Sequence, residues 1–306
     1  EVFLYCESMA IDVDSIVDES GAAQMEMNFL HGDPVNLADQ VFSFKRLLHE
    51  TAMKYGIFAT FMAKPMDRQP GSSIHIHQSI VRSEDGKNIF IDEHGNENKF
   101  FRHYIGGLQK YTNAMMALYA PNPNSYRRFR KGSAAPINVN WGYDNRTVGI
   151  RIPAGSADSK RVENRFAGVD ANPYLVMAAT LASGYLGMKM AIEPTAPLYG
   201  SSYDEEVSLP LSLEQALQLL DESEEVRKVL GNDFVEAFYN KSHPLHLQSQ
   251  RVYWNSVRNP LPAVPGRARG CWCGLRARLR LMKLKSLSCL LQAMTLHSGV
   301  FRTTFI

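Results

Sequence analysis

The sequence predicts an α+β fold with a largely antiparallel sheet flanked by helices. Segments whose apolar residues recur at helical spacing are mixed with strand-like segments in no strict alternation. A doubly wound parallel sheet would require regular alternation of strands and helices, so it is disfavoured. Capping residues mark where several of the helices begin. No internal repeat is apparent.

The first helix is predicted over residues 36–55. Asn36 is a suitable N-cap, and Gly56 suits the left-handed residue that often follows a helix. The apolar residues at helical spacing are Leu37, Val41, Phe44 and Leu48.

Three further helices are predicted. One covers residues 100–118. Asn172 and Pro173 supply an N-cap and a first-turn proline for the next, and Ser212 with Gln215 forms a capping box for the last.

Strands are predicted where apolar and β-branched residues are bounded by turn residues. The segments 57–63 and 74–81 and the short segment 89–91 fit this pattern. Strands are also expected to dominate residues 135–166.

Composition excludes several function classes. The chain has 306 residues, is 45% hydrophobic and carries a formal net charge of +2, too small to indicate a nucleic-acid partner or a membrane surface. The uncharged stretch 173–188 is shorter than the roughly 20 residues that span a bilayer. No signal peptide is visible, so we expect a cytoplasmic protein.

The last fifty residues differ from the rest. No Asp or Glu follows Glu236, and prolines and glycines precede an Arg/Leu-rich segment. We therefore predict a domain boundary near residue 256 and an atypical basic tail over 257–306. The tail is interpreted as disordered or as the product of a frame shift or wrong splicing. The alternative is a basic amphipathic segment that lies on anionic membranes or joins a partner.

A pair of histidines forms the first candidate for chemistry. His75 and His77 lie in the predicted 74–81 strand, where residues two apart project from the same face. Both imidazoles could therefore point into one site. A pair of purely structural histidines is the alternative.

Carboxylates and arginines supply two further sets of candidates. Glu19, Glu26 and Glu163, with one imidazole, form an oxygen-rich ligand set that suits Mg²⁺ or Mn²⁺ rather than a thiolate zinc site. Guanidinium groups match carboxylate and phosphate oxygens in a bidentate manner. The candidate arginines are Arg128, Arg146, Arg151, Arg161 and Arg165. Taken singly, each of these carboxylates is better explained as a solvated charge, and the alternative for the arginines is a set of surface salt bridges.

Neither a P-loop nor a Rossmann glycine motif occurs in the sequence. If ATP binds, metal ions and arginines would have to hold its phosphates.

Several long motifs, in order along the chain, together resemble the glutamine synthetase superfamily. They are KPMDRQPGSSIHIHQS (64–79), NSYRRFRKGSAAPINVNWGYDNRTVGIRIP (124–153), RVENRF (161–166) and DANPYL (170–175). With QMEMNFLHGDP (24–34), their wording looks most like the γ-glutamylpolyamine synthetase branch. The resemblance implies a catalytic domain of that type over residues 1–256, incomplete at its N-terminus.

The resemblance implies roles for individual residues. The implied metal ligands are Glu19, Glu26, His75 and Glu163. The implied contacts to the substrate glutamate are Gly71, Arg128 and Arg165. The residues implied to line the nucleotide phosphates are His77, Ser79, Arg146 and Arg151, with Arg146 also the implied catalytic residue and Arg161 placed near the base.

In this family ATP phosphorylates the side-chain carboxylate of glutamate, and an amine then attacks the acyl phosphate. Mg²⁺ or Mn²⁺ neutralises the polyphosphate, and arginines stabilise the charge on the transferring oxygens. No protein nucleophile is needed. The family assembles as homo-oligomeric rings with sites between neighbouring subunits, so we expect this chain alone to have little activity.

Position 134 departs from the pattern of enzymes that use ammonia. Those enzymes have a Glu two residues before the proline that corresponds to Pro136, and this sequence has Ala134. An alkylammonium with a pKa of about 10.4 must lose a proton before it can attack, which costs roughly 4–5 kcal/mol at pH 7. Ala134 cannot accept that proton. We interpret the change as favouring a bulkier amine than ammonia.

Two other departures concern the glutamate site and the front of the chain. Pro70 stands before Gly71, where Asn is common in the family. Neither the family's N-terminal β-grasp domain nor its Glu-x-Glu pair precedes Glu19, so the expected metal site is incomplete.

The sequence thus predicts an ATP-dependent ligase that joins L-glutamate, through a γ-glutamyl phosphate, to a polyamine or monoamine. Its partners would be these small molecules and further copies of itself in a ring. The alternatives are a glutamine synthetase that uses ammonia and a catalytically inactive fragment with a binding or structural role.

Overall fold

The computed structural model describes residues 1–242 and 300–305. Its helices include α1 (Val2–Ser8), α2 (Pro34–Lys54), α3 (Lys99–Tyr119), the 3-10 helix η1 (Ser125–Arg128), α4 (Pro173–Lys189), α5 (Leu213–Glu222) and α6 (Glu224–Leu230). Its strands are β1 (Val13–Asp18), β2 (Met25–Phe29), β3 (Ile76–Val81), β4 (Trp141–Tyr143), β5 (Ile150–Ile152), β6 (Val162–Asn164) and β7 (Val300–Phe305).

These strands form two sheets. β1 and β2 make an antiparallel hairpin, and the main sheet has the strand order β4-β5-β6-β3-β7. Only the β4–β5 pair is parallel, and the other three pairs of the main sheet are antiparallel. The α+β prediction with a largely antiparallel sheet is confirmed.

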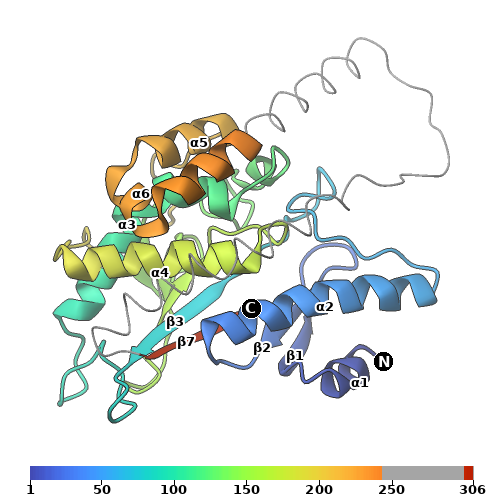
Figure 1. Ribbon diagram of the computed structural model, residues 1–306, viewed down its shortest axis with the longest axis horizontal. Helices are drawn as coiled ribbons and strands as arrows, with labels where there is room; N and C mark the ends of the chain where they lie inside the picture. The colour runs from blue at the N-terminus through green and yellow to red at the C-terminus, as the bar shows by residue number, and fades with distance from the viewer. Residues whose placement is uncertain (243–299, 306) are drawn as a thin grey trace.

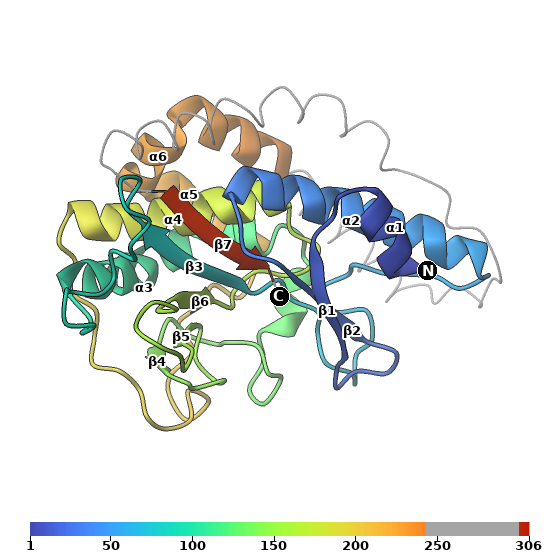
Figure 2. The ribbon, with the colours of Figure 1, turned by 90° about the horizontal axis from the view of Figure 1, so that it is seen from below.

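Helices cover one face of the main sheet. α3 and α4 pack together beside the sheet, and α5 and α6 lie on their outer side (Figures 1 and 2). The β1–β2 hairpin and α2 lie at the other end of the molecule (Figure 1). In the described ranges, no helix has both the length and the apolar character needed to cross a membrane.

The alternation of β3 separates the core from a second, polar face. Ile76, Gln78 and Ile80 are buried, and Gln78 Oε1 accepts a hydrogen bond of 2.8 Å from Tyr104 on α3. His77 and Ser79 therefore project from the opposite face, away from α3. The same logic applies to β6, where Asn164 Nδ2 donates to Tyr119 on α3, so Glu163 also points away from the helices.

Capping residues explain where helices begin. Asn172 and Ser212 accept hydrogen bonds from backbone N–H groups of α4 and α5, as predicted. The predicted cap Asn36 is wrong. Asp33 caps α2 instead, because its Oδ1 accepts from Val35 N at 2.9 Å and from Asn36 N at 3.0 Å, with Pro34 in the first turn.

Two predicted strands are wrong. Residues 57–63 form no strand, and residues 89–91 contain only a turn and the isolated bridge of Ile91 with Glu97. Residues 135–166 contain three strands, each three residues long. The predicted boundary near residue 256 lies outside the described residues. Of the predicted tail, residues 300–305 form β7 beside β3, and the rest stays a prediction.

α3 and α4 approach each other closely through glycines. A Cβ atom on Gly107 would lie 2.2 Å from Ser183 O and 2.6 Å from Gly187 Cα. We therefore expect Gly107→Ala to lower the free energy of unfolding by about 1–3 kcal/mol, because the helices would have to separate. Urea unfolding measures the change. The matched control is Gly200→Ala, since no atom lies within 4 Å of its added Cβ; equal effects of the two substitutions would contradict the prediction.

Candidate active site

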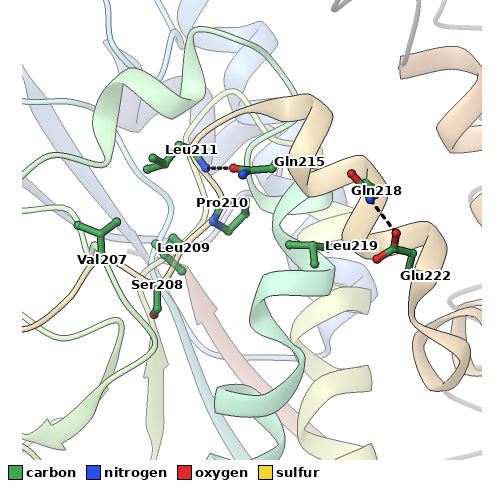
Figure 3. A pocket seen from close by; sticks show the side chains of 9 residues that line it. All are labelled: Val207, Ser208, Leu209, Pro210, Leu211, Gln215, Gln218, Leu219 and Glu222. Carbon is green, nitrogen blue, oxygen red and sulfur yellow. Dashed lines mark hydrogen bonds between the residues drawn. The ribbon is translucent and has the colours of Figure 1, made fainter.

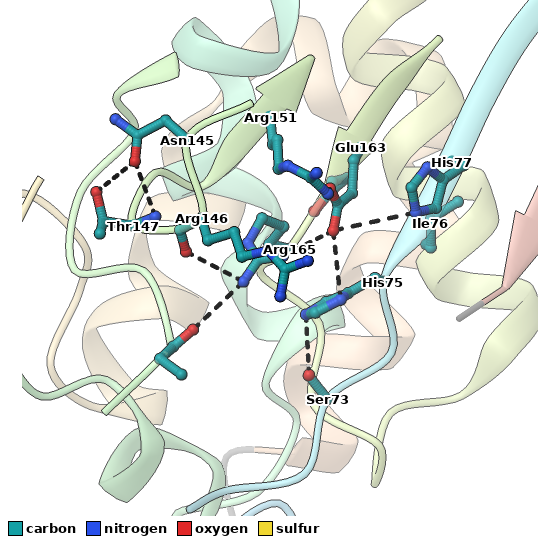
Figure 4. A network of polar contacts seen from close by, with 12 residues as sticks. Ser73, His75, Ile76, His77, Asn145, Arg146, Thr147, Arg151, Glu163 and Arg165 are labelled. Carbon is teal, nitrogen blue, oxygen red and sulfur yellow. Dashed lines mark hydrogen bonds and ion pairs between the residues drawn. The ribbon is translucent and has the colours of Figure 1, made fainter. Parts of the chain in front are cut away.

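Glu163 is the centre of a cluster on the polar face of the main sheet. His77 and Arg151 are its register partners on the two neighbouring strands. Its carboxylate is 2% exposed and forms ion pairs with Arg165 Nη1 at 2.7 Å and with Arg151 Nη1 at 2.9 Å. Oε1 also lies 3.3 Å from His75 Nδ1 and 4.0 Å from His77 Nε2 (Figure 4). Four of the predicted site residues thus surround a fifth.

Electrostatics keep this carboxylate ionised. Burial alone would raise the pKa of Glu163, but its interactions with His75, Arg165, His77 and Arg151 hold the pKa at about 2. The ion pairs of a buried carboxylate are little weakened by solvent. Glu163 therefore carries a full negative charge at neutral pH.

Both histidines are neutral at the same pH. Burial and the charges of nearby arginines together lower the pKa of His75 to about 3 and that of His77 to about 4. His75 Nε2 lies 3.0 Å from Ser73 Oγ, and Arg161 Nε donates to His77 Nδ1 at 3.1 Å. A neutral imidazole is the form that binds a metal ion.

The β1–β2 hairpin brings two more carboxylates toward this cluster. Glu19 lies in the hairpin turn and Glu26 on β2. The hairpin is docked onto the loop before β3, because Gln24 Nε2 donates to Gly71 O at 3.0 Å and to Ser72 Oγ at 3.1 Å.

Glu26 is influenced by the other carboxylates. Burial raises its pKa, a hydrogen bond and the charge of Glu19 raise it further, and the charge of Glu163 acts in the same direction. The three predicted acidic ligands therefore interact electrostatically. A divalent cation would relieve this repulsion, and carboxylates with neutral imidazole are a suitable donor set for Mg²⁺ or Mn²⁺.

The side chains are not arranged as a closed coordination shell. Within residues 1–242 and 300–305, no group of three or more His, Cys, Asp or Glu side chains is placed to hold a metal ion. Arg151 and Arg165 bind the oxygens of Glu163. The ligand set Glu19, Glu26, His75 and Glu163 stays a prediction that the donor chemistry fits.

Arg128 and Gly71, predicted to contact glutamate, lie against each other. A Cβ atom on Gly71 would lie 2.6 Å from Arg128 Cγ, so only glycine allows this approach. Arg128 is 3% exposed, and its Nη2 donates to Phe166 O. Burial lowers the pKa of Arg128 to about 10, which still leaves it cationic at neutral pH.

The remaining predicted residues surround the cluster less tightly. Ser79 lies on β3, on the same face as His77. Arg161 contacts His77, as described above. Arg146 is exposed and extends toward His75 and Glu163 (Figure 4), and no ion pair of its guanidinium occurs in the described residues. Its backbone carbonyl accepts a hydrogen bond of 3.2 Å from Arg165 Nη2.

Buried polar atoms without hydrogen-bond partners gather in this region. Eight such side-chain atoms occur in the described part of the chain. Four of them are N–H groups or ring nitrogens of predicted site residues, namely Arg128 Nε, Arg151 Nε, Arg165 Nε and His77 Nε2. Buried polar groups are normally satisfied, so this concentration favours a polar, anionic ligand at the site.

A separate pocket of about 430 Å³ lies elsewhere. It is lined by residues 207–211 with Gln215, Gln218, Leu219 and Glu222 (Figure 3). None of the predicted site residues lines it, so it does not belong to the Glu163 cluster.

Sequence reasoning did not single out several residues that hold the cluster. Ser73 contacts His75, Gln24 docks the hairpin, and Asp144 forms an ion pair with Arg151. Ser73 and Asp144 lie inside the motifs that carry the family resemblance. Gln24 is the first residue of the QMEMNFLHGDP motif, but nothing in that motif assigned it a contact.

Comparison with known proteins identifies similar chains. The family model described as "Glutamine synthetase, catalytic domain" matches residues 1–252. Gamma-glutamylputrescine synthetase PuuA of Escherichia coli (strain K12) is 36% identical over 244 residues, covering 79% of this chain and 52% of that protein. Glutamate–isopropylamine ligase of Pseudomonas sp is 37% identical, covering 78% and 53%. Glutamine synthetase of Thermococcus kodakarensis is 35% identical, covering 76% and 54%. The chain thus spans about half the length of these relatives.

Two solved structures have a fold similar to that of this chain. GmaS without ligand has a TM-score of 0.74 at 29% identity, covering 82% of this chain and 59% of that one. A GmaS/ADP complex has a TM-score of 0.75 at 28% identity, covering 85% and 62%.

Proposed function

The chain belongs to the glutamine synthetase catalytic-domain family, as its motifs predicted, and from this premise we propose that it ligates the γ-carboxylate of L-glutamate to an amine with ATP. The convergence of His75, His77, Arg151 and Arg165 on Glu163 carries the proposal. Residues far apart in the sequence form one buried, charged cluster. Such a cluster is common at sites that perform chemistry.

The proposed metal ligands are Glu19, Glu26, His75 and Glu163. Bound Mg²⁺ or Mn²⁺ would neutralise negative charge on the nucleotide phosphates. The like charges around Glu26 and the neutral state of His75 support this assignment.

The proposed binding residues divide between the two substrates. Gly71, Arg128 and Arg165 would bind glutamate. His77, Ser79, Arg146 and Arg151 would bind the phosphates, and Arg161 would lie near the base. The guanidinium groups hold the polyanions and stabilise charge on the transferred phosphoryl group.

The reaction proceeds in two steps. The γ-carboxylate attacks the γ-phosphorus of ATP, which forms γ-glutamyl phosphate and releases ADP. The free amine then attacks the acyl carbon, and phosphate leaves as the amide forms and the amine loses a proton.

The acceptor is proposed to be an alkyl amine, either a polyamine or a monoamine. Ala134 is exposed and has a φ of 60°, and it offers no carboxylate to accept a proton or to hold an ammonium ion. The printed names of two relatives, a γ-glutamylputrescine synthetase and a glutamate–isopropylamine ligase, are in line with such an acceptor. The full protein is proposed to act in the cytoplasm as a homo-oligomeric ring.

The amine is tested by phosphate release. With ATP, Mn²⁺ and L-glutamate, we expect the full-length protein to release phosphate about tenfold faster with putrescine or isopropylamine than with ammonium, because position 134 lacks the acidic group. The control is Ala134→Glu, which should shift the preference toward ammonium. Faster release with ammonium in the unaltered protein would contradict the proposed acceptor.

Two alternatives have distinct outcomes. An ammonia-using glutamine synthetase is supported by relatives of that name at nearly equal identity. An inactive chain with a binding role would release no phosphate with any amine. If ATP with Mn²⁺ also failed to raise the melting temperature, nucleotide binding itself would be excluded.

A further inference from the structure

Asp170 lies in the turn between β6 and α4, and it has no role in the proposed reaction so far. Its Oδ2 accepts hydrogen bonds from Ser125 Oγ at 2.6 Å and from Asn122 Nδ2 at 2.8 Å. Both donors belong to the segment that leads into and begins η1. Because η1 is only one turn long and ends at Arg128, fixing its first residue also fixes Arg128.

The turn that carries Asp170 is itself fixed from two sides. Lys45 on α2 donates from Nζ to Val169 O at 2.5 Å and to Ala171 O at 3.1 Å. Val169 N donates to Ser72 O at 3.1 Å, next to Gly71. The turn therefore connects α2 with the loop that packs on Arg128.

The charge of Asp170 also reaches Arg128. In the described ranges no carboxylate forms an ion pair with Arg128, and Asp170 is the acidic group that opposes the effect of burial on its pKa. Arg151 and Arg165 differ from Arg128, since each forms an ion pair with Glu163.

Both Arg128 Nε and Asp170 Oδ1 are buried without a hydrogen-bond partner in the described residues. The Arg128 guanidinium and the Asp170 carboxylate therefore form no direct hydrogen bond, although the charge of Asp170 acts on the pKa of Arg128. Arg128 keeps a free N–H donor and a full positive charge, which are the properties that binding a carboxylate requires.

We propose that Asp170 is a positioning residue: it holds η1 and the Gly71 loop so that Arg128, which forms no ion pair in the described residues, presents its guanidinium to the carboxylate of a bound amino acid. The inference rests on the proposed function, in which Arg128 and Gly71 bind glutamate. Hydrogen bonds to Ser125 and Asn122 provide the geometry, and the carboxylate charge stabilises the buried cation without competing for it.

The test is calorimetric titration of the full chain with L-glutamate and, separately, with ATP and Mn²⁺. Asp170→Ala is expected to raise the Kd for glutamate by about tenfold or more and to change the Kd for ATP by less than about twofold. Asp170→Asn retains an acceptor for Ser125 and should recover part of the loss. Ser125→Ala, a milder change, should raise the glutamate Kd by a few-fold.

Asp221→Ala is the matched control, because Asp221 pairs with Arg227 on α6 and should leave both Kd values unchanged. Melting temperatures show that each variant is folded. Equal glutamate affinity in Asp170→Ala, Ser125→Ala and the unaltered chain would overturn this inference and leave the proposed function standing. Parallel loss of glutamate and ATP binding would also overturn it, since the role would then be general. Failure of the unaltered chain to bind glutamate would overturn both.

Discussion

Replacing Glu163 with alanine is expected to destabilise the protein by about 3–5 kcal/mol, because the buried guanidinium of Arg165 and the partly buried guanidinium of Arg151 lose the carboxylate that they share. Within the described residues, Arg165 would keep only its hydrogen bonds to the backbone carbonyls of Ala134 and Arg146. Arg151 would keep Asp144, so the larger part of the loss arises at Arg165. A domain of this kind is stable by roughly 5–15 kcal/mol, so the substitution removes a large fraction of the total.

A graded series separates charge from packing. Glu163→Gln keeps the shape and one acceptor oxygen, and we expect a loss of stability between those of the unaltered protein and Glu163→Ala. Urea unfolding at neutral pH measures each variant. All variants should also lose phosphate release, since Glu163 is a proposed metal ligand.

The matched control is Glu193→Ala. Glu193 forms an ion pair with Arg102 at 2.7 Å, but its side chain is 54% exposed. An exposed pair contributes about 0–1 kcal/mol. If Glu163→Ala cost no more than Glu193→Ala, the interpretation of Glu163 as the buried centre of the site would be wrong.

The part of this site that the sequence could predict is the part set by local periodicity. His75 and His77 were expected to share a face because side chains alternate along a strand, and both approach the same carboxylate. The helices around residues 36–55 and 100–118 were expected for the same kind of reason and occur within two residues of the predicted limits.

Errors arose where a neighbouring residue or a partner strand decides the outcome. Asn36 was a plausible cap, but Asp33 followed by Pro34 supplies both a better acceptor and a proline in the first turn. Residues 57–63 have a strand-like pattern, yet a strand requires a neighbouring strand to pair with, and in the described ranges this segment pairs with no strand.

The arginines show the limit of reasoning from residue type. Their number predicted an anion-binding surface, but sequence could not assign their individual partners. A buried guanidinium needs a nearby counter-charge, and strand register places Glu163 directly beside Arg151. Asp170 was within a quoted motif, but its contacts with Ser125 and Asn122 depend on chain segments more than 40 residues away.

Arg146→Ala is expected to reduce kcat for phosphate release by about 10³-fold while changing stability by less than about 0.5 kcal/mol. The two effects separate because Arg146 is exposed and its guanidinium forms no ion pair in the described residues, although its side chain extends toward the cluster (Figure 4). A group of this kind contributes little to folding. In the proposed reaction, its charge remains available for the oxygens of the transferred phosphoryl group.

The effects expected of Arg146→Ala differ from those expected of Glu163→Ala. Glu163→Ala should impair folding and activity together, whereas Arg146→Ala should impair activity alone. Arg146→Lys keeps the charge but loses the planar fork, so it should restore only part of kcat.

Arg46→Ala is the control: Arg46 is an exposed arginine on α2 whose removal should alter neither kcat nor stability. Since the backbone carbonyl that binds Arg165 is retained in Arg146→Ala, a large loss of stability would contradict the assignment. So would unchanged kcat, because a phosphate-binding cation in the reaction cannot be removed without slowing the chemical step.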